Sequence, residues 1–164
     1  MRVFITGATG YIGGSVAVRL IEAGHRVTGL ARSAEKADAL DGIGVEPVVG
    51  TLDDAETLAS AARAADAVVN AASSDHREAV DVLIDALADS GKVLIHTSGS
   101  SIVGDDSRGE ASERVYTEAD VLGDWEPEPD KAARVALDRA VLAASDRGVR
   151  SAVLCNTLIY GHGR

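Results

Sequence analysis

Apolar runs of strand length alternate with helix-length segments along most of the chain, and this alternation restricts the possible folds more than any other feature of the sequence. Several runs, such as Val3-Phe4-Ile5, contain no polar residue, which is typical of strands covered on both faces. Repeated strand-helix-strand units build a parallel sheet with helices on both sides. We therefore predict an α/β fold with a doubly wound parallel sheet, a Rossmann fold in three α/β/α layers.

Strand and helix positions can be assigned from the same pattern. We expect strands at residues 2–6, 26–31, 45–49, 67–70, 92–97 and 150–154. We expect helices at residues 11–23, 34–40, 54–65, 75–90 and 130–147. Gly24, Gly91 and Gly148 each follow a helical segment, where a left-handed residue can close the last turn. Asp53 or Asp54 can cap the third helix.

Length and composition exclude several classes of protein. A chain of 164 residues fits one domain, and it has no apolar run near the roughly 20 residues that span a bilayer. Sixteen basic against 26 acidic residues give a net charge of -10, which repels nucleic acids and anionic membrane surfaces. No signal-peptide stretch precedes the first glycine motif and Cys155 is the single cysteine, so we expect a cytoplasmic protein.

Residues 104–130 interrupt the alternation. This stretch holds ten acidic residues against Arg108 and Arg114. A segment of more than about 15 residues without regular structure inside a compact domain is usually functional or disordered. Two interpretations stay open, a solvated mobile loop and a flap over an active site.

A glycine-rich turn joins the first predicted strand to the first predicted helix. A glycine at the strand end permits a tight turn, the next lets a pyrophosphate approach the backbone, and the third lets helix and strand pack closely. The helix N-terminus adds unpaired N–H groups and a partial positive charge. A tight turn without a ligand is the alternative. The expected cofactor contacts in this turn are Gly7, Thr9, Gly10, Tyr11, Ile12 and Gly13.

The spacing of these glycines, G-x-x-G-x-x-G, resembles that of the short-chain dehydrogenase/reductase superfamily. The similarity is to its extended and atypical members, the NAD-dependent epimerase/dehydratases and NmrA-like proteins, and it implies a nicotinamide dinucleotide cofactor. Where NAD-specific members carry an acidic residue, this chain has Arg32 and Ser33. A guanidinium attracts a 2′-phosphate, so Arg32, Ser33 and Lys36 favour NADP. NAD stays possible, as does a plain surface arginine.

Two further segments correspond to cofactor-contacting stretches of the superfamily. The family usually reads Gly-Asp-Leu after the third strand, whereas this chain has Gly50 followed by Thr51 and Leu52. The hydroxyl of Thr51, or Asp53, would then replace the acidic contact to adenine. The fourth strand ends in Asn70 and small residues, which suit either packing or the approach of a ligand. The expected contacts in these two segments are Thr51, Leu52, Asn70, Ala71 and Ala72.

The catalytic Tyr-x-x-x-Lys pattern of the superfamily is incomplete here. In active members the lysine lowers the pKa of the tyrosine and holds the nicotinamide ribose, while the tyrosine transfers a proton. None of Tyr11, Tyr116 and Tyr160 has a lysine four residues later. Lys131 resembles the family lysine, and Pro127 then takes the place of the tyrosine. General acid-base catalysis contributes about 10²- to 10⁴-fold, so we expect a weakened reductase unless Tyr116 enters the site.

A serine-rich stretch after the fifth strand resembles the family segment that orients the substrate oxygen. Ser98 and Ser100 are the candidates, although simple turn chemistry also explains such a cluster. With Lys131 they form the expected catalytic set. No serine has a convincing His and Asp partner for a hydrolase triad, and the scattered histidines predict no metal site. We expect Cys155 to be a small buried residue rather than a nucleophile.

The resemblance also implies a C-terminal substrate-binding portion after Tyr160 and Gly161. We therefore expect residues 1–164 to form the NAD(P)-binding Rossmann domain without that portion. One hypothesis is an NADP-preferring oxidoreductase or epimerase that acts on a carbonyl, an alcohol or a sugar nucleotide. The alternatives are a nonenzymatic NmrA-like sensor or interaction protein and a domain for another nucleotide or a flavin. We expect a small-molecule substrate, no nucleic-acid or membrane partner, and allow for a homodimer.

Overall fold

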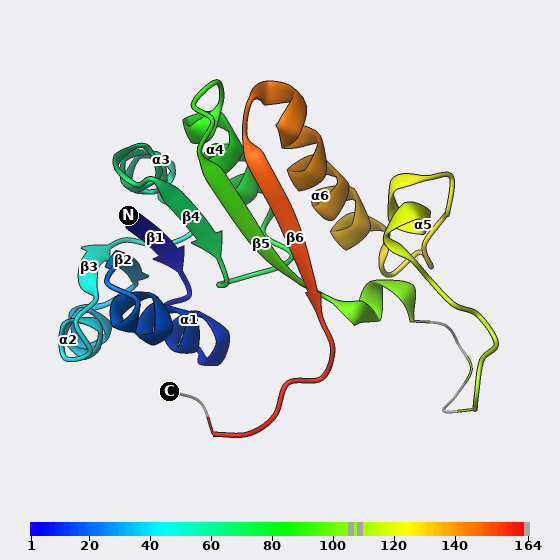
Figure 1. Ribbon diagram of the computed structural model, residues 1–164, viewed down its shortest axis with the longest axis horizontal. Coiled ribbons are helices and arrows are strands. Elements are labelled where there is room, and N and C mark those ends of the chain that lie inside the picture. The colour runs from blue at the N-terminus through cyan, green and yellow to red at the C-terminus, as the bar shows by residue number, and fades with distance from the viewer. Residues whose placement is uncertain (105–106, 108–109, 163–164) are drawn as a thin grey trace.

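A single parallel sheet organises the molecule, as the computed structural model shows for residues 1–104, 107 and 110–162 (Figure 1). Its strands lie in the order β3-β2-β1-β4-β5-β6. Their bounds are β1 Arg2–Thr6, β2 Arg26–Ala31, β3 Glu46–Val49, β4 Ala67–Asn70, β5 Val93–Gly99 and β6 Arg150–Asn156. The predicted doubly wound parallel sheet is confirmed.

Helices cover both faces of the sheet. Their bounds are α1 Tyr11–Glu22, α2 Ala34–Asp41, α3 Ala55–Ala64, α4 Arg77–Leu87, α5 Glu118–Leu122 and α6 Ala132–Ala143. Ala17 of α1 and Leu40 of α2 belong to one buried apolar cluster. Leu58 of α3, Leu83 of α4 and Leu137 of α6 belong to another. Figure 1 shows these two groups of helices on opposite faces, which confirms the three α/β/α layers.

The direction of winding reverses between β1 and β4. Thr6, the last residue of β1, pairs in register with Asn70, the last residue of β4, while β2 and β5 flank this pair on its two sides. The chain leaves β1 and β4 toward opposite faces, so a crevice opens beyond their carboxyl ends. Ligands of open α/β sheets bind at such a switch point, and this is the end at which the candidate residues lie.

The glycines predicted to end helices and the predicted cap of α3 are found in the structure. Gly24, Gly91 and Gly148 have positive φ angles of 82°, 65° and 71°, as predicted for residues that follow a helix. Of the two aspartates expected at the start of α3, Asp54 is the cap, because its carboxylate accepts a hydrogen bond from Thr57 N at 3.1 Å. The strands β5 and β6 extend two residues beyond their predicted ends.

The acidic stretch, for which a mobile loop and an active-site flap were both left open, contains some regular structure. A 3-10 turn at Ser100–Val103 precedes it, and α5 lies within it. Thr117 and Asp120 form a capping box at the start of α5, and Arg139 of α6 donates to Val121 O at 2.9 Å and to Trp125 O at 2.7 Å. These bonds attach α5 to α6. The acidic residues 105 and 106 and the basic residue 108, which belong to this stretch of the sequence, lie outside the described residues.

Candidate functional site

The glycine turn after β1 packs against the end of β4. Gly7 has φ +75°, and a Cβ atom built on it would lie 2.5 Å from Ala71 O and 2.7 Å from Ala72 N. A Cβ on Gly13 would overlap the backbone of Gly7. Neither position has room for a side chain, so only glycine allows the turn to pack this closely against the end of β4 and the start of α1.

The N-terminus of α1 is left without a side-chain cap. Its N-cap residue, Gly10, has no side chain that could accept a hydrogen bond from the first N–H groups, and its first turn contains no acidic residue. By contrast, Ser33 caps α2, Asp54 caps α3 and His76 caps α4. The geometry of a helix leaves its first N–H groups without an intrahelical partner. In α1 these groups, from Tyr11 onward, are therefore available to an anion.

The residues expected at the adenosine end lie along the same edge of the sheet. Arg32 directly follows β2, is exposed, and makes no hydrogen bond or ion pair with any described residue. Ser33 Oγ accepts a hydrogen bond from Lys36 N at 3.3 Å. Thr51 Oγ1 accepts one from Asp53 N at 3.2 Å. Leu52 instead packs against the core, so its side chain supports the turn.

A hollow of about 720 Å³, including space open to solvent, lies beyond the carboxyl ends of β4 and β5. It is lined by Ile12, Ala71, Ala72, Ser73, Ser74, Asp75, Thr97, Ser98, Gly99 and Arg134. Ile12 belongs to the first turn of α1, so the hollow is continuous with the glycine turn. The fold thus brings together three expected cofactor contacts, Ile12, Ala71 and Ala72, and one expected catalytic residue, Ser98.

Two other expected catalytic residues do not line this hollow. Ser100 begins the 3-10 turn after β5. Lys131 is the N-cap residue of α6 and donates to its neighbour Asp130 at 2.5 Å. Tyr116, considered as a replacement proton donor, packs edge-on against Trp125 with ring centroids 5.7 Å apart. The structure therefore leaves Ser98 as the one member of the expected set at the hollow.

Arg134 is a residue of the hollow that the sequence analysis missed. Its Nε and Nη2 each donate to the Asp75 carboxylate at 2.7 Å, and its Nη1 donates to Ser101 Oγ at 3.1 Å. The aspartate fixes the guanidinium in a bidentate geometry. The sequence does contain a signal for it, because Arg134 and Asp138 are four residues apart and therefore lie on the same face of α6.

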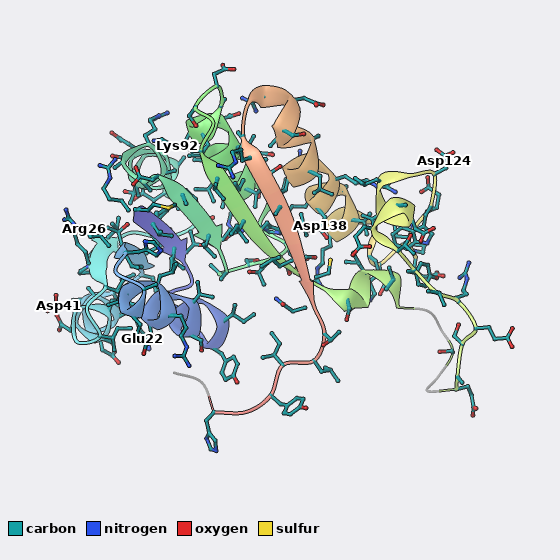
Figure 2. The ribbon with its side chains drawn as sticks, in the orientation of Figure 1. Glu22, Arg26, Asp41, Lys92, Asp124 and Asp138 are labelled. Carbon is teal, nitrogen blue, oxygen red and sulfur yellow. The ribbon has the colours of Figure 1, made fainter. Side chains whose placement is uncertain are left out.

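A chain of buried polar groups lies behind the hollow. Ser98 Oγ donates to Asp138 Oδ2 at 2.7 Å, and Asp138 Oδ1 lies 3.6 Å from His96 Nε2. Asn70 Nδ2 lies 2.9 Å from His96 Nδ1, and Thr6 Oγ1 donates to Asn70 Oδ1 at 2.5 Å. The side chain of Asn70, expected near the cofactor, is therefore part of the interior. Figure 2 labels Asp138 on α6.

Burial shifts both titratable groups of this chain toward their neutral forms. It lowers the pKa of His96 to about 4, against a smaller opposing effect of Asp75. Burial also raises the pKa of Asp138, while the Ser98 hydrogen bond and the Arg134 charge oppose the rise. Arg134, in turn, holds the pKa of Asp75 below its ordinary value, mainly through hydrogen bonds. The site thus pairs an ionised surface carboxylate with a carboxyl that resists ionisation.

No three His, Cys, Asp or Glu side chains gather as a metal site within the described part of the chain. Likewise, none of its described helices is long and apolar enough to cross a bilayer.

Cys155 is exposed rather than buried as expected, because β6 is the edge strand of the sheet. Partial burial of its thiol and the nearby Asp138 raise its pKa, which disfavours a nucleophilic thiolate.

Known proteins share both the sequence and the fold. Residues 7–139 match the sequence model of a family described as NAD(P)H-binding. The oxidase ucsJ of Acremonium sp is 38% identical over 180 residues, covering 99% of this chain and 51% of that protein. A 4-hydroxy-2-methyl-3-oxo-4-farnesyl-3,4-dihydroquinoline-1-oxide ketoreductase of Stigmatella aurantiaca is 36% identical over 81 residues, covering 49% of this chain and 24% of that protein.

Among solved structures, the UDP-glucose 4-epimerase of Thermus thermophilus in complex with NAD has a TM-score of 0.71 at 24% identity, over 94% of this chain and 54% of that one. This likeness shows the fold. The chain spans about half the length of the curated relatives that match nearly all of it. The chain belongs to the NAD(P)H-binding family, which agrees with the dinucleotide cofactor expected from the glycine spacing.

Proposed function

We propose that this chain is the cofactor-binding domain of an NADP-preferring oxidoreductase that acts on the carbonyl or alcohol group of a small molecule. The observation that carries the proposal is the continuity between the glycine turn and a hollow containing Ser98 and Arg134. An anion-binding helix end thus leads directly to polar groups suited to a substrate oxygen. The relatives named as an oxidase and a ketoreductase support the same reaction class.

The residues at the turn fit a dinucleotide. Gly7 and Gly13 let the turn pack closely against β4 and α1, because a Cβ at either position would overlap the backbone of Ala71 or of Gly7. The uncapped amides that begin with Tyr11 would receive the pyrophosphate. Arg32, which has no partner among the described residues, would receive the 2′-phosphate together with the Ser33 hydroxyl. These roles follow from exposed donors along one edge of the sheet.

The hollow supplies the reacting groups. When bound, the nicotinamide ring donates or accepts a hydride. Ser98 lines the hollow and its hydroxyl can donate to the oxygen of a carbonyl substrate. Arg134 uses three of its five N–H groups on Asp75 and Ser101, so two remain for a substrate oxygen or a ribose hydroxyl. We propose this arginine in place of Lys131 for that task.

A nonenzymatic dinucleotide sensor is the second candidate function. One observation favours it. Tyr116, the candidate proton donor, packs against Trp125 and is not among the residues that line the hollow. A screen of ketones, quinones and sugar nucleotides with NADPH distinguishes the two functions. Turnover excludes a pure sensor, whereas cofactor binding without turnover of any compound in the screen favours the sensor.

Cofactor preference is tested by titrating the protein with NADPH and with NADH and following nucleotide fluorescence. We expect NADPH to bind at least tenfold more tightly, and Arg32→Glu to remove that difference, because the new carboxylate repels the 2′-phosphate. Arg26→Glu is the matched control, since Arg26 is an exposed arginine at the opposite end of the same strand (Figure 2). Equal affinities in the unmodified protein would contradict the NADP preference.

A further inference from the structure

Asp138 combines full burial with an unsatisfied oxygen. It is 1% exposed, and its Oδ2 accepts the hydrogen bond from Ser98. Its Oδ1 is buried without a hydrogen-bond partner in the part of the chain that the structure describes. A buried carboxylate oxygen without a donor is costly, whereas a protonated carboxyl in the same place is much less so. The arrangement therefore favours a carboxyl that holds a proton.

His96 faces this oxygen with a ring N–H. Asn70 Oδ1 accepts from Thr6, so the amide NH₂ of Asn70 points at His96 Nδ1 and donates to it. The neutral ring must then carry its proton on Nε2, which lies 3.6 Å from Asp138 Oδ1. This distance is too long for an ordinary hydrogen bond. The ring N–H can nevertheless stabilise a negative charge that appears on Asp138.

Charged and titratable groups from several elements lie near Asp138. Arg134 lies one turn earlier on α6, but its charge is largely balanced by the bidentate contact with Asp75. Asp75 lies in the segment between β4 and α4, and Cys155 on β6 is also within electrostatic range. His96 approaches from β5 and is kept neutral by its burial. No nearby cation is therefore left unbalanced to hold Asp138 ionised among the described residues.

We propose that Asp138 stores the proton that Ser98 delivers to the substrate oxygen, in place of the tyrosine that this chain lacks. Ser98 is suited to this task because it lines the hollow on one side and contacts the carboxyl on the other. At an oxygen-oxygen distance of 2.7 Å, a protonated Asp138 donates to Ser98 Oγ, which frees the serine hydroxyl to donate into the hollow. This inference rests on the proposed oxidoreductase function.

The proton transfer balances for the reduction of a carbonyl. A bound dinucleotide would supply the hydride for the carbonyl carbon, and the C=O π pair would then become a negative charge on the substrate oxygen. That oxygen takes the Ser98 hydroxyl proton, and Ser98 Oγ takes the proton of Asp138, so one O–H bond breaks for each one formed. The Asp138 carboxylate is then stabilised by His96. After the product leaves, a solvent proton returns through Ser98, and alcohol oxidation follows the reverse order.

The variant Asp138→Asn tests this role. Asparagine keeps an oxygen that accepts the Ser98 hydrogen bond but carries no transferable proton. We expect kcat for carbonyl reduction to fall about 100-fold, with KM and the NADPH affinity within twofold of the unmodified values. The decline of kcat with rising pH, as Asp138 loses its proton, should disappear in the variant. Asp81→Asn, at a half-exposed aspartate on α4 that pairs with Arg77, is the control and should leave kcat unchanged.

A readout that needs neither cofactor nor substrate completes the test. Infrared difference spectra between the unmodified protein and Asp138→Asn should show the C=O band of a protonated carboxyl well above pH 3.8, the ordinary pKa of an aspartate. A carboxylate that is ionised throughout, or a variant with unchanged kcat, would show that Asp138 only attaches α6 to β5. Failure of the unmodified protein to bind NADPH or turn over any carbonyl would overturn the proposed function, and with it this role, before any variant is compared.

Discussion

The two halves of the candidate site are built by different means. On the side of β1, α1 and β2, backbone amides and the absence of side chains form the anion-binding turn. On the side of β5 and α6, side chains from distant segments, such as Ser98 and Asp138, form the reacting hollow. The first half depends on residues that are adjacent in sequence. The second depends on how the helix is rotated against the sheet.

This difference predicts that the first half tolerates changes of pH better than the second half and tolerates added atoms less well. Backbone amides do not titrate, whereas both buried titratable side chains of the described residues, His96 and Asp138, lie in the second half. Conversely, a carbon atom added at Gly7 would overlap the backbone of Ala71, because no free volume is available there. Variants of the two halves should therefore fail in different experiments.

The largest effect is expected for Gly7→Ala. The added methyl group lies against the backbone of Ala71, so the turn must move and its amides lose their positions. We expect NADPH affinity to fall more than 100-fold in a fluorescence titration. Gly24→Ala is a matched control, because Gly24 has a similar φ of +82° but no atom within 4 Å of the added Cβ.

Gly24→Ala should keep NADPH affinity within twofold and lower the free energy of unfolding by about 1 kcal/mol, the cost of a left-handed alanine. If the two variants lost affinity equally, backbone strain alone would explain the loss. The close packing of the glycine turn against β4 would then have no special role in binding.

The second effect concerns acid stability. The folded pKa of His96 is lowered from 6.5 to about 4, so the unfolded chain binds this proton at a higher pH than the folded chain. The stability contributed by neutral His96 is therefore fully present above pH 6.5 and is lost as the pH falls toward 4. The total loss is about 3 to 4 kcal/mol, at 1.4 kcal/mol for each pKa unit.

Urea unfolding at a series of pH values measures this loss, and His96→Gln should remove it. Asp138 acts in the opposite sense, because its raised pKa lets the folded chain take up a proton first as the pH falls. The difference between the unmodified protein and the variant therefore isolates the imidazole. Parallel stability profiles for the two proteins would mean that His96 is not held neutral by burial.

A smaller effect separates the arginine of the hollow from the lysine expected from the sequence. Arg134→Gln removes the charge that lines the hollow and the bidentate bond to Asp75. We expect kcat/KM to fall about 10- to 30-fold, which corresponds to about 1.4 to 2 kcal/mol. Lys131→Gln should change kcat/KM less than twofold. The opposite ranking in steady-state kinetics would restore Lys131 to the role that the family resemblance implied.

Sequence reasoning was most accurate where a pattern is local. The alternation of strands and helices, the glycine turn and the cap at Asp54 each depend on a few adjacent residues, and the structure confirms them. The missed contacts are long-range. Arg134 and Asp75 are 59 residues apart, and Ser98 and Asp138 are 40 apart, so their meeting depends on the position of α6 on the sheet.

The short helix α5 was missed for a similar reason. Its five residues are too few to show a clear apolar period, and its attachment to α6 comes from the distant side chain of Arg139. Lys131 was expected in the site because it resembles the family lysine, on a helix predicted to begin at residue 130. The structure begins α6 at Ala132, so the lysine falls at the N-cap and outside the hollow.

Backbone amide NMR shifts during an NADPH titration test the central claim most directly. The account predicts saturable changes in the ¹⁵N–¹H signals of Tyr11, Ile12 and Gly13, with the same dissociation constant as the fluorescence titration. Gly7→Ala should abolish these changes. Unchanged signals at these three amides with millimolar NADPH bound elsewhere would contradict the assignment of the glycine turn as the pyrophosphate site.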